Sequence, residues 1–436
     1  MFKALLDKNK QNQILSVTHQ LLMAVYGFAL LLILYRVASK EETGRWVVFI
    51  SSISLFDMLL HGFFQTPVIR KISTEKADTE QINKITSNAF FFSLVIWLVL
   101  SVVILCSHFL FHRSEMAGDM LWYLPLGLAM ILFDIAWWSG NALSDFKAVL
   151  IQRIVFCIVS GSMIAVTLYH HKTLGLYDIA LSQLLGYIIS SYVGIVILRK
   201  IKISYRYINK ETLLYFLHYG KYTAGSMMMG SILRNADVFM IAFFLGRGAV
   251  AVYSAAQKTV EIFEVPLRGI AAHSFTEFCK FSADIQLLIK RYFFITGRLM
   301  LVFVGALVLM AFFSQQVIRL LSGSSAYSSA ALLLRIFMVY VLFLTSDRML
   351  GVVLEALGLV RYNLVKTIIV ALVNIVGNFI ALYYFHSLAG VAVVSIVAVL
   401  AGIISGSYFV SSQTGMAWPK PNIRTGLVNI FKWNLQ

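Results

Sequence analysis

A stripe of polar side chains crosses the otherwise apolar stretch 249–271, and its members are the first candidates for chemistry. They are Tyr253, Gln257, Lys258, Glu261, Glu264 and Arg268. At about 100° per residue these side chains fall within an arc of roughly 140° on one helix. Lysine and arginine held in a polar interior can bind an anion such as a phosphate. The stripe could also neutralise itself, because it contains pairs at helical ion-pair spacing, Lys258–Glu261 and Glu264–Arg268.

A second candidate pair lies in the apolar stretch 46–66, where Asp57 and His61 share one helical face. Burial can bring a carboxylic acid or an imidazole into a physiological titration range, so the pair could carry protons. The alternative is a hydrogen-bonded pair that fixes the packing of the helix. Both interpretations turn Asp57 and His61 towards a polar interior, because charged groups are costly in hydrocarbon.

Arg234 and Asp237 lie near the middle of the apolar stretch 223–245. Arg234 is the cation placed deepest in an apolar stretch, and a guanidinium can bind phosphate through two hydrogen bonds. Its spacing of three residues from Asp237 also allows a local ion pair. The sequence leaves both roles open, an anion anchor and a counter-ion of Asp237.

Asp347 and Arg348 are adjacent in the stretch 330–354, so their side chains must point in different directions on a helix. We expect the side chain of one of them to face the polar interior, and the sequence does not say which. Three further charged residues fall near the ends of their stretches, and interfacial positions are expected for Asp134, Arg153 and Glu355.

These residues sit in a chain built for a membrane. Of its 436 residues, 59% are hydrophobic and 13% are charged, a composition typical of a polytopic membrane protein. A spanning helix needs about 20 apolar residues, and about twelve stretches qualify. They lie near 14–38, 46–66, 87–110, 120–141, 150–170, 178–198, 223–245, 249–271, 292–313, 330–354, 364–385 and 389–411.

The net charge of +16 is unevenly distributed. If the N-terminus is placed inside, most Lys and Arg residues fall on the same side of the membrane, including those of the tail, Lys420, Arg424 and Lys432. This is the positive-inside bias, which predicts cytoplasmic termini and accounts for the charge without nucleic acid. Phosphate-binding loops, HExxH and Gly-x-Ser-x-Gly motifs are missing, so no enzyme is indicated.

The chain is predicted to consist of two six-helix bundles, residues 1–209 and 210–436, separated by the longest polar connection. An offset of 207 residues aligns Asp57 with Glu264, and an offset of 213 aligns Asp134 with Asp347 and Arg153 with Lys366. These matches favour a duplicated unit in parallel orientation, related by a pseudo-twofold axis. The segment 210–220 could form a short amphipathic elbow at the interface.

Three stretches carry a resemblance to a known family. They are Asn235 to Gly246 followed by Ala249 to Lys258, Glu42-Thr-Gly44-Arg-Trp46, and Gly358 to Asn363 with Asn374, Asn378 and Gly390. The sequence resembles the polysaccharide transporters, the O-antigen-type flippases of the multidrug/oligosaccharidyl-lipid/polysaccharide exporter superfamily. Ala251 stands where this family usually has glycine.

The resemblance implies an all-α, MATE-like fold of twelve helices in two bundles around a cavity that opens alternately to each side of the bacterial inner membrane. The implied substrate is an oligosaccharide on undecaprenyl diphosphate, such as an O-antigen or lipopolysaccharide repeat unit. Cations could hold its anionic head group, and the candidates are Arg234, Lys258, Arg268 and Arg348. The acidic or coupling candidates are Asp57, His61, Asp237, Glu261, Glu264 and Asp347.

Several functions stay open. A lipid II flippase is one, because the charge pattern does not separate it from the other flippases. A drug or cation antiporter of the same superfamily is another, although residues 14–38 lack the proline and the acidic residue that such exporters commonly carry in the first helix. A membrane glycan polymerase or ligase is another, although the outward connections are short. No cofactor or metal is expected, and coupling to protons or sodium is open. Expected partners are the bilayer and the lipid-linked glycan, with a polymerase and chain-length proteins as further candidates.

Overall fold

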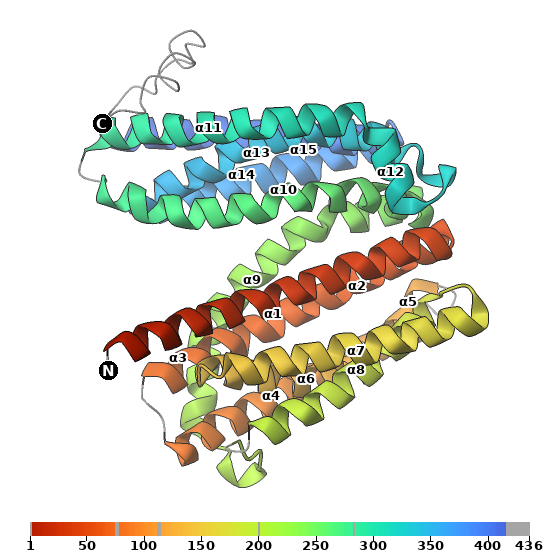
Figure 1. The fold of residues 1–436 in the computed structure, drawn as a ribbon, viewed down its shortest axis with the longest axis vertical. Coiled ribbons are helices and arrows are strands. Elements are labelled where there is room, and N and C mark those ends of the chain that lie inside the picture. The colour runs from red at the N-terminus through yellow and green to blue at the C-terminus, as the bar shows by residue number, and fades with distance from the viewer. Residues whose placement is uncertain (1, 75–77, 111–114, 199–200, 282–283, 416–436) are drawn as a thin grey trace. The chain divides into compact units, whose positions relative to one another are not determined.

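The computed structural model describes residues 2–74, 78–110, 115–198, 201–281 and 284–415, and every regular element in these ranges is helical (Figure 1). The all-α prediction is therefore confirmed. The basic tail with Lys420, Arg424 and Lys432 lies outside the described residues. The chain divides into two compact units, residues 1–235 and 236–436, and the division falls within one long helix. The boundary of the duplicated unit at 209/210 stays a prediction.

The described residues of the first unit form eight complete helices and the first part of a ninth. They are α1 (Phe2–Val37), α2 (Lys40–Leu60), the π-helical turn η1 (His61–Gln65), α3 (Thr66–Thr74), α4 (Thr79–Leu110), α5 (Glu115–Met120), α6 (Tyr123–Ala142), α7 (Phe146–His171), α8 (Leu176–Ile197), the 3-10 turn η2 (Tyr205–Tyr207) and α9 (Lys210–Leu245). Within this unit α7 packs along α8 and α1, and α6 packs along α8 and α4.

The second unit contains the end of α9 and six further helices. They are α10 (Arg247–Lys280), α11 (Ile285–Phe312), α12 (Ser314–Ser322), the 3-10 turn η3 (Ser325–Tyr327), α13 (Ala330–Ala356), α14 (Val360–Tyr383) and α15 (Leu388–Thr414). The long helices run alongside one another, with α13 in contact with α10, α11, α14 and α15 (Figure 1). Because α13 touches four neighbours, its side chains are placed to meet those of several helices.

Ten of the described helices are long and apolar enough to cross a membrane, and α9 makes an eleventh if its two bent parts form one span. The protein is therefore a multi-pass membrane protein. The sequence predicts twelve spans, and the remaining one, at 249–271, lies in α10. This helix is not among the apolar ones, because Lys258, Glu261, Glu264 and Arg268 fall within three turns of it.

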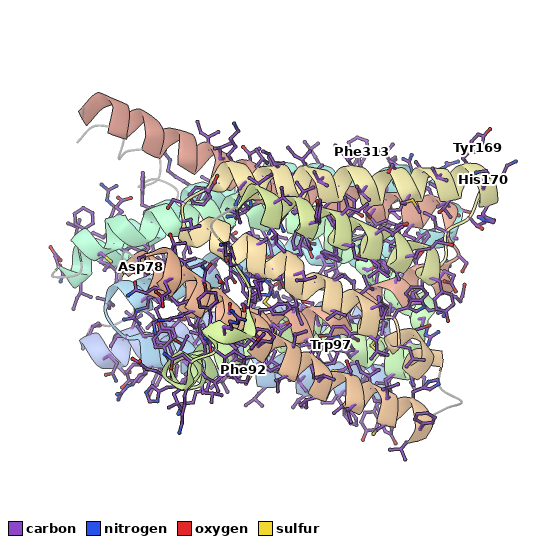
Figure 2. The ribbon with its side chains drawn as sticks, turned by 90° about the horizontal axis from the view of Figure 1, so that it is seen from below. Asp78, Phe92, Trp97, Tyr169, His170 and Phe313 are labelled. Atoms are coloured by element: carbon purple, nitrogen blue, oxygen red, sulfur yellow. The ribbon has the colours of Figure 1, made fainter. Side chains whose placement is uncertain are left out.

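Helix α4 shows how polarity is distributed in the first unit. Its apolar side chains Val99, Val102 and Val103 are more than half exposed, whereas its polar Asn83 and Asn88 are buried. The buried amides hold the chain that follows α8, since Asn83 accepts a hydrogen bond from the Lys202 amide at 2.7 Å. This is the arrangement expected of a helix whose outer face meets lipid rather than water. Figure 2 shows Phe92 and Trp97 on this helix.

The start of α9 crosses the π-helical turn η1 at very close range. A Cβ atom added to Gly62 would lie 2.2 Å from the Ala224 Cα, and one added to Gly220 would lie 2.8 Å from the Phe63 side chain. The Thr223 hydroxyl donates a hydrogen bond to the Gly62 carbonyl. Residues 210–220 are thus the first turns of α9 and do not form a separate elbow, because glycine lets this helix pack directly on η1.

Candidate functional site

The polar stripe of α10 contains both ion pairs that its spacing predicts. The Lys258 Nζ lies 2.6 Å from a Glu261 carboxylate oxygen, and the Arg268 Nη2 lies 3.1 Å from Glu264 Oε2. The Arg268 side chain is nevertheless 56% exposed. Lys258 and Glu261 therefore neutralise each other, whereas much of the Arg268 side chain stays accessible.

A second arginine approaches the same carboxylate. Arg348 on α13 places its Nη2 3.8 Å from Glu264 Oε2, the oxygen that also contacts Arg268. Two guanidinium groups thus share one carboxylate, which leaves this triad with a net charge of +1. The structure also separates the adjacent pair of the tenth predicted stretch, because Arg348 turns towards the α10 stripe and Asp347 turns elsewhere.

Asp347 pairs with Lys366 on α14, a residue that the sequence-based site did not include. The Lys366 Nζ lies 2.7 Å from Asp347 Oδ1 and also donates to the Asp347 backbone carbonyl at 3.0 Å. Glycines on α15 make room for this buried pair, since a Cβ on Gly402 would lie 2.3 Å from Asp347 Oδ1. The alignment of Asp134 with Asp347 and of Arg153 with Lys366 was the signal that could have found it.

Asp237 is buried, and its hydrogen-bond partners are neutral. The Tyr253 hydroxyl donates to Oδ2 at 2.6 Å, and the Asn378 amide donates to Oδ1 at 2.7 Å. Asn378 also donates to the Asn374 side chain at 3.1 Å. The local ion pair that the spacing of Arg234 and Asp237 allows is not formed. Tyrosine and asparagine side chains from α10 and α14 satisfy the carboxylate instead.

Arg234 is exposed, and its Nε donates to the Gly230 carbonyl of its own helix at 3.3 Å. Within the described residues it forms no ion pair. Of the two roles that the sequence left open, the structure removes that of counter-ion to Asp237. The role of anion anchor stays a prediction.

In the first unit, Asp57 and His61 are joined by Asp134 from α6. The His61 Nδ1 lies 3.1 Å from Asp57 Oδ1, and the His61 Nε2 lies 3.9 Å from Asp134 Oδ1. A ring nitrogen of His61 and one carboxylate oxygen from each aspartate all lie within 4.8 Å of one another. His61 is hydrogen-bonded to the backbone carbonyl of Asp57 and contacts its carboxylate, so the two residues do pair, but the pair belongs to a larger cluster.

Two of the residues expected at interfacial positions are buried within this unit. Asp134 is 4% exposed and Arg153 is 8% exposed. The Arg153 guanidinium lies over the Trp137 ring at 4.5 Å and interacts electrostatically with Asp134. The two opposite charges can be buried because each offsets the desolvation cost of the other. Glu355, in contrast, is exposed.

The two units carry matching sets of charged residues. The offsets seen in the sequence relate Asp57, Asp134 and Arg153 to Glu264, Asp347 and Lys366, and the 207-residue offset also places His61 opposite Arg268. In each unit the first acidic residue pairs with the residue four positions later. One position differs in kind, because an imidazole stands in the first unit where the second has a guanidinium.

The motif around Glu42 is structural. Its carboxylate accepts a hydrogen bond from the Leu176 amide at the start of α8 at 3.0 Å, and it also pairs with Arg45. Arg45 in turn pairs with Asp119 and lies 5.3 Å from the Tyr177 ring. These contacts tie the first turn of α2 to α5 and α8, so they set the geometry of one end of the unit.

Residues 10–275 match the family described as "Polysaccharide biosynthesis protein". The fold is similar to an inward-facing multidrug resistance MATE family transporter of the MOP superfamily, with a TM-score of 0.73 and 16% identity over 90% of this chain and 95% of that one. It is also similar to the lipid II flippase MurJ in an inward closed conformation, with a TM-score of 0.71 and 16% identity over 97% and 90% of the two chains. A MOP superfamily transporter from Pyrococcus furiosus Vc1 follows, with a TM-score of 0.56, 16% identity and coverage of 92% and 94%. No curated protein matches. At these identities the structural likeness shows a MATE-like fold.

Proposed function

The chain belongs to the polysaccharide biosynthesis protein family of the MOP superfamily, and from that premise we propose that it flips a lipid-linked oligosaccharide across its membrane. The protein is a membrane transporter and not an enzyme, which removes the polymerase or ligase alternative. The proposed substrate is an oligosaccharide on undecaprenyl diphosphate, such as an O-antigen repeat unit. Without a polar path, its charged and hydroxylated head group would have to cross hydrocarbon unsolvated.

The observation that carries the proposal is the triad of Arg268, Glu264 and Arg348. A diphosphate esterified at both ends carries one negative charge on each phosphate. The triad has one positive charge in excess, and its two guanidinium groups can donate to phosphate oxygens through several N–H groups. Since Arg268 is more than half exposed, an anion can reach it without displacing a buried partner.

The same triad weighs against the alternative substrate class. A cationic drug would be repelled by a site with a net charge of +1, whereas an anionic head group would be attracted. The apolar stretch 14–38 also lacks the acidic residue expected of a drug antiporter. Lys258 and Arg234 are supporting cations in this proposal, and Glu261 serves as the local partner of Lys258.

We place the transporter in the bacterial inner membrane with both termini in the cytoplasm, on the basis of the distribution of Lys and Arg. The glycan would then be accepted at the cytoplasmic leaflet and released at the outer one. A polymerase and chain-length proteins acting on the outer side are candidate partners, because they would consume the product.

The test is deletion of the gene in its source strain, followed by complementation. Loss of surface glycan together with accumulation of the lipid-linked precursor in the deletion strain supports the proposal. As the control measurement, the sensitivity of that strain to cationic drugs should be unchanged. Normal surface glycan combined with increased drug sensitivity in the deletion strain would identify an antiporter instead.

A further inference from the structure

The cluster of Asp57, His61 and Asp134 in the first unit has a geometry that the binding of a head group does not explain. We propose that it is a binding site for one exchangeable proton, which is taken up on the His61 Nε2 and stabilised by the negative charge of the Asp134 carboxylate. Its contribution to transport rests on the proposed flippase function, whereas proton binding itself does not.

The hydrogen bonds of His61 determine which ring nitrogen exchanges the proton. Nδ1 lies 2.7 Å from the Asp57 backbone carbonyl and 3.1 Å from Asp57 Oδ1, and both oxygens are acceptors. Nδ1 must therefore carry a hydrogen in either charge state. The exchangeable position is Nε2, which faces Asp134 Oδ1 at 3.9 Å.

Asp134 supplies the second half of the site. It is 4% exposed, and its Oδ2 is buried without a hydrogen-bond partner among the described residues. A buried carboxylate oxygen without a donor is costly, because its lost hydration is not replaced. A positive charge gained by His61 offsets part of this cost, because it lies beside the buried carboxylate of Asp134.

The charges of the cluster fit one monovalent positive charge. Asp57 and Asp134 contribute two negative charges, Arg153 contributes one positive charge, and neutral His61 contributes none. One added proton brings the buried set to neutrality, which lowers the cost of burial. A divalent cation would leave it at +1 beside the Arg153 guanidinium. The imidazole ligand suits a proton better than sodium, which prefers oxygen.

Apart from the imidazole of His19, the titratable groups around the cluster are tyrosine hydroxyls, a thiol and the charged groups already counted. Trp137 and Trp138 of α6 pack against the His61 ring, with centroid distances of 5.1 and 5.4 Å. The groups that interact electrostatically with Asp57, Asp134 or Arg153 from the surrounding helices are His19 of α1, Tyr123 of α6, Cys157 of α7 and Tyr187 of α8. Within the cluster itself, His61 is the residue that can gain a positive charge.

The second unit has a permanently charged residue at the position that corresponds to His61. Arg268 occupies the position equivalent to His61 and pairs with Glu264 as His61 pairs with Asp57. A guanidinium stays charged at all physiological pH values, whereas an imidazole can gain and lose its charge. If the predicted duplication holds, position 61 is where the first unit carries a residue whose charge can switch and the second unit does not.

The cluster also lies where a change of charge can act on a neighbouring helix. His61 is the first residue of η1, and π-helical turns occur frequently at functional sites. The next residue, Gly62, is the one over which α9 crosses, and its carbonyl accepts the Thr223 hydrogen bond. Protonation of His61 is therefore placed one residue from the contact that holds the start of α9.

The first test measures proton binding directly on the full-length protein in lipid nanodiscs, by NMR titration of labelled histidine side chains. His61→Gln assigns the His61 signal. Asp134→Asn is expected to lower the proton affinity of His61 by at least about tenfold, because a nearby negative charge is lost. The control is His170→Gln at the far end of α7 (Figure 2), which should leave the His61 titration unchanged. An unchanged proton affinity in Asp134→Asn would overturn the proposal.

The second test measures flipping of the lipid-linked glycan in proteoliposomes with and without an imposed pH gradient. The wild-type rate is expected to respond to the gradient, and the rates of His61→Gln and His61→Arg should not. A gradient response that persists in both variants would overturn the transport role of the site. If no form of the protein moves the glycan, the flippase proposal has failed, and the NMR titration still decides whether the proton site exists.

Discussion

Replacing Arg268 by alanine should weaken binding of a diphosphate-linked glycan without unfolding the protein. The side chain is 56% exposed, and its ion pair with Glu264 is of the surface kind, which contributes about 0–1 kcal/mol to folding. A charge-assisted hydrogen bond contributes about 1.5–3 kcal/mol. Its loss therefore corresponds to about ten- to hundredfold weaker binding.

Glu264→Gln gives the sharpest contrast, because it removes the carboxylate shared by Arg268 and Arg348. The net charge of the triad would rise from +1 to +2, so binding of the anion should be maintained or tightened. Arg319→Ala serves as the matched control, since it removes another exposed arginine of the second unit that lies on α12. The readouts are calorimetric affinity in nanodiscs, surface glycan, and the amount of protein in the membrane.

Two results would refute this reasoning. Wild-type affinity in Arg268→Ala would show that the triad does not contact the head group. Equal losses in Arg268→Ala and Glu264→Gln would show that the triad acts as a structural unit, because removing an acid should not weaken binding of an anion.

Other contacts lead to predictions about stability. Lys366→Met should cost about 3–5 kcal/mol, because it leaves the Asp347 carboxylate unpaired, and adding Asp347→Asn should recover much of the loss in a thermal-stability assay. Gly62→Ala should lower the yield of folded protein measured by size-exclusion chromatography, whereas Gly27→Ala, where a Cβ meets nothing within 4 Å, should not. Glu42→Gln should lower the melting temperature, since the weaker neutral acceptor at the start of α8 no longer pairs with Arg45.

Local spacing predicted a large part of the candidate site. The ion pairs Lys258–Glu261 and Glu264–Arg268, and the contact of His61 with Asp57, follow from helical geometry alone. The helical fold could be predicted from the length of the apolar stretches, because a helix needs about 20 apolar residues to span a bilayer. In contrast, a spacing of three did not pair Arg234 with Asp237, since better partners come from other helices.

The missed contacts are all between helices. Asp134 reaches His61 from α6, Lys366 reaches Asp347 from α14, and Asn378 reaches Asp237 from α14. One sequence contains no direct record of which helix faces meet. The internal repeat was the available signal, because one acid and one base, Asp134 and Arg153, recur at an offset of 213 residues as Asp347 and Lys366. Buried charges that recur together are best explained as pairs.

The most direct measurement of the central claim follows the leaflet in which the glycan resides. Purified protein would be reconstituted into vesicles containing undecaprenyl-diphosphate-linked oligosaccharide from the source strain, and the exposed fraction would be determined with a lectin over time. The account predicts transfer between leaflets that depends on the protein and is slowed in Arg268→Ala at equal protein content. Transfer no faster than in protein-free vesicles, in a preparation that transports a cationic dye, would contradict it.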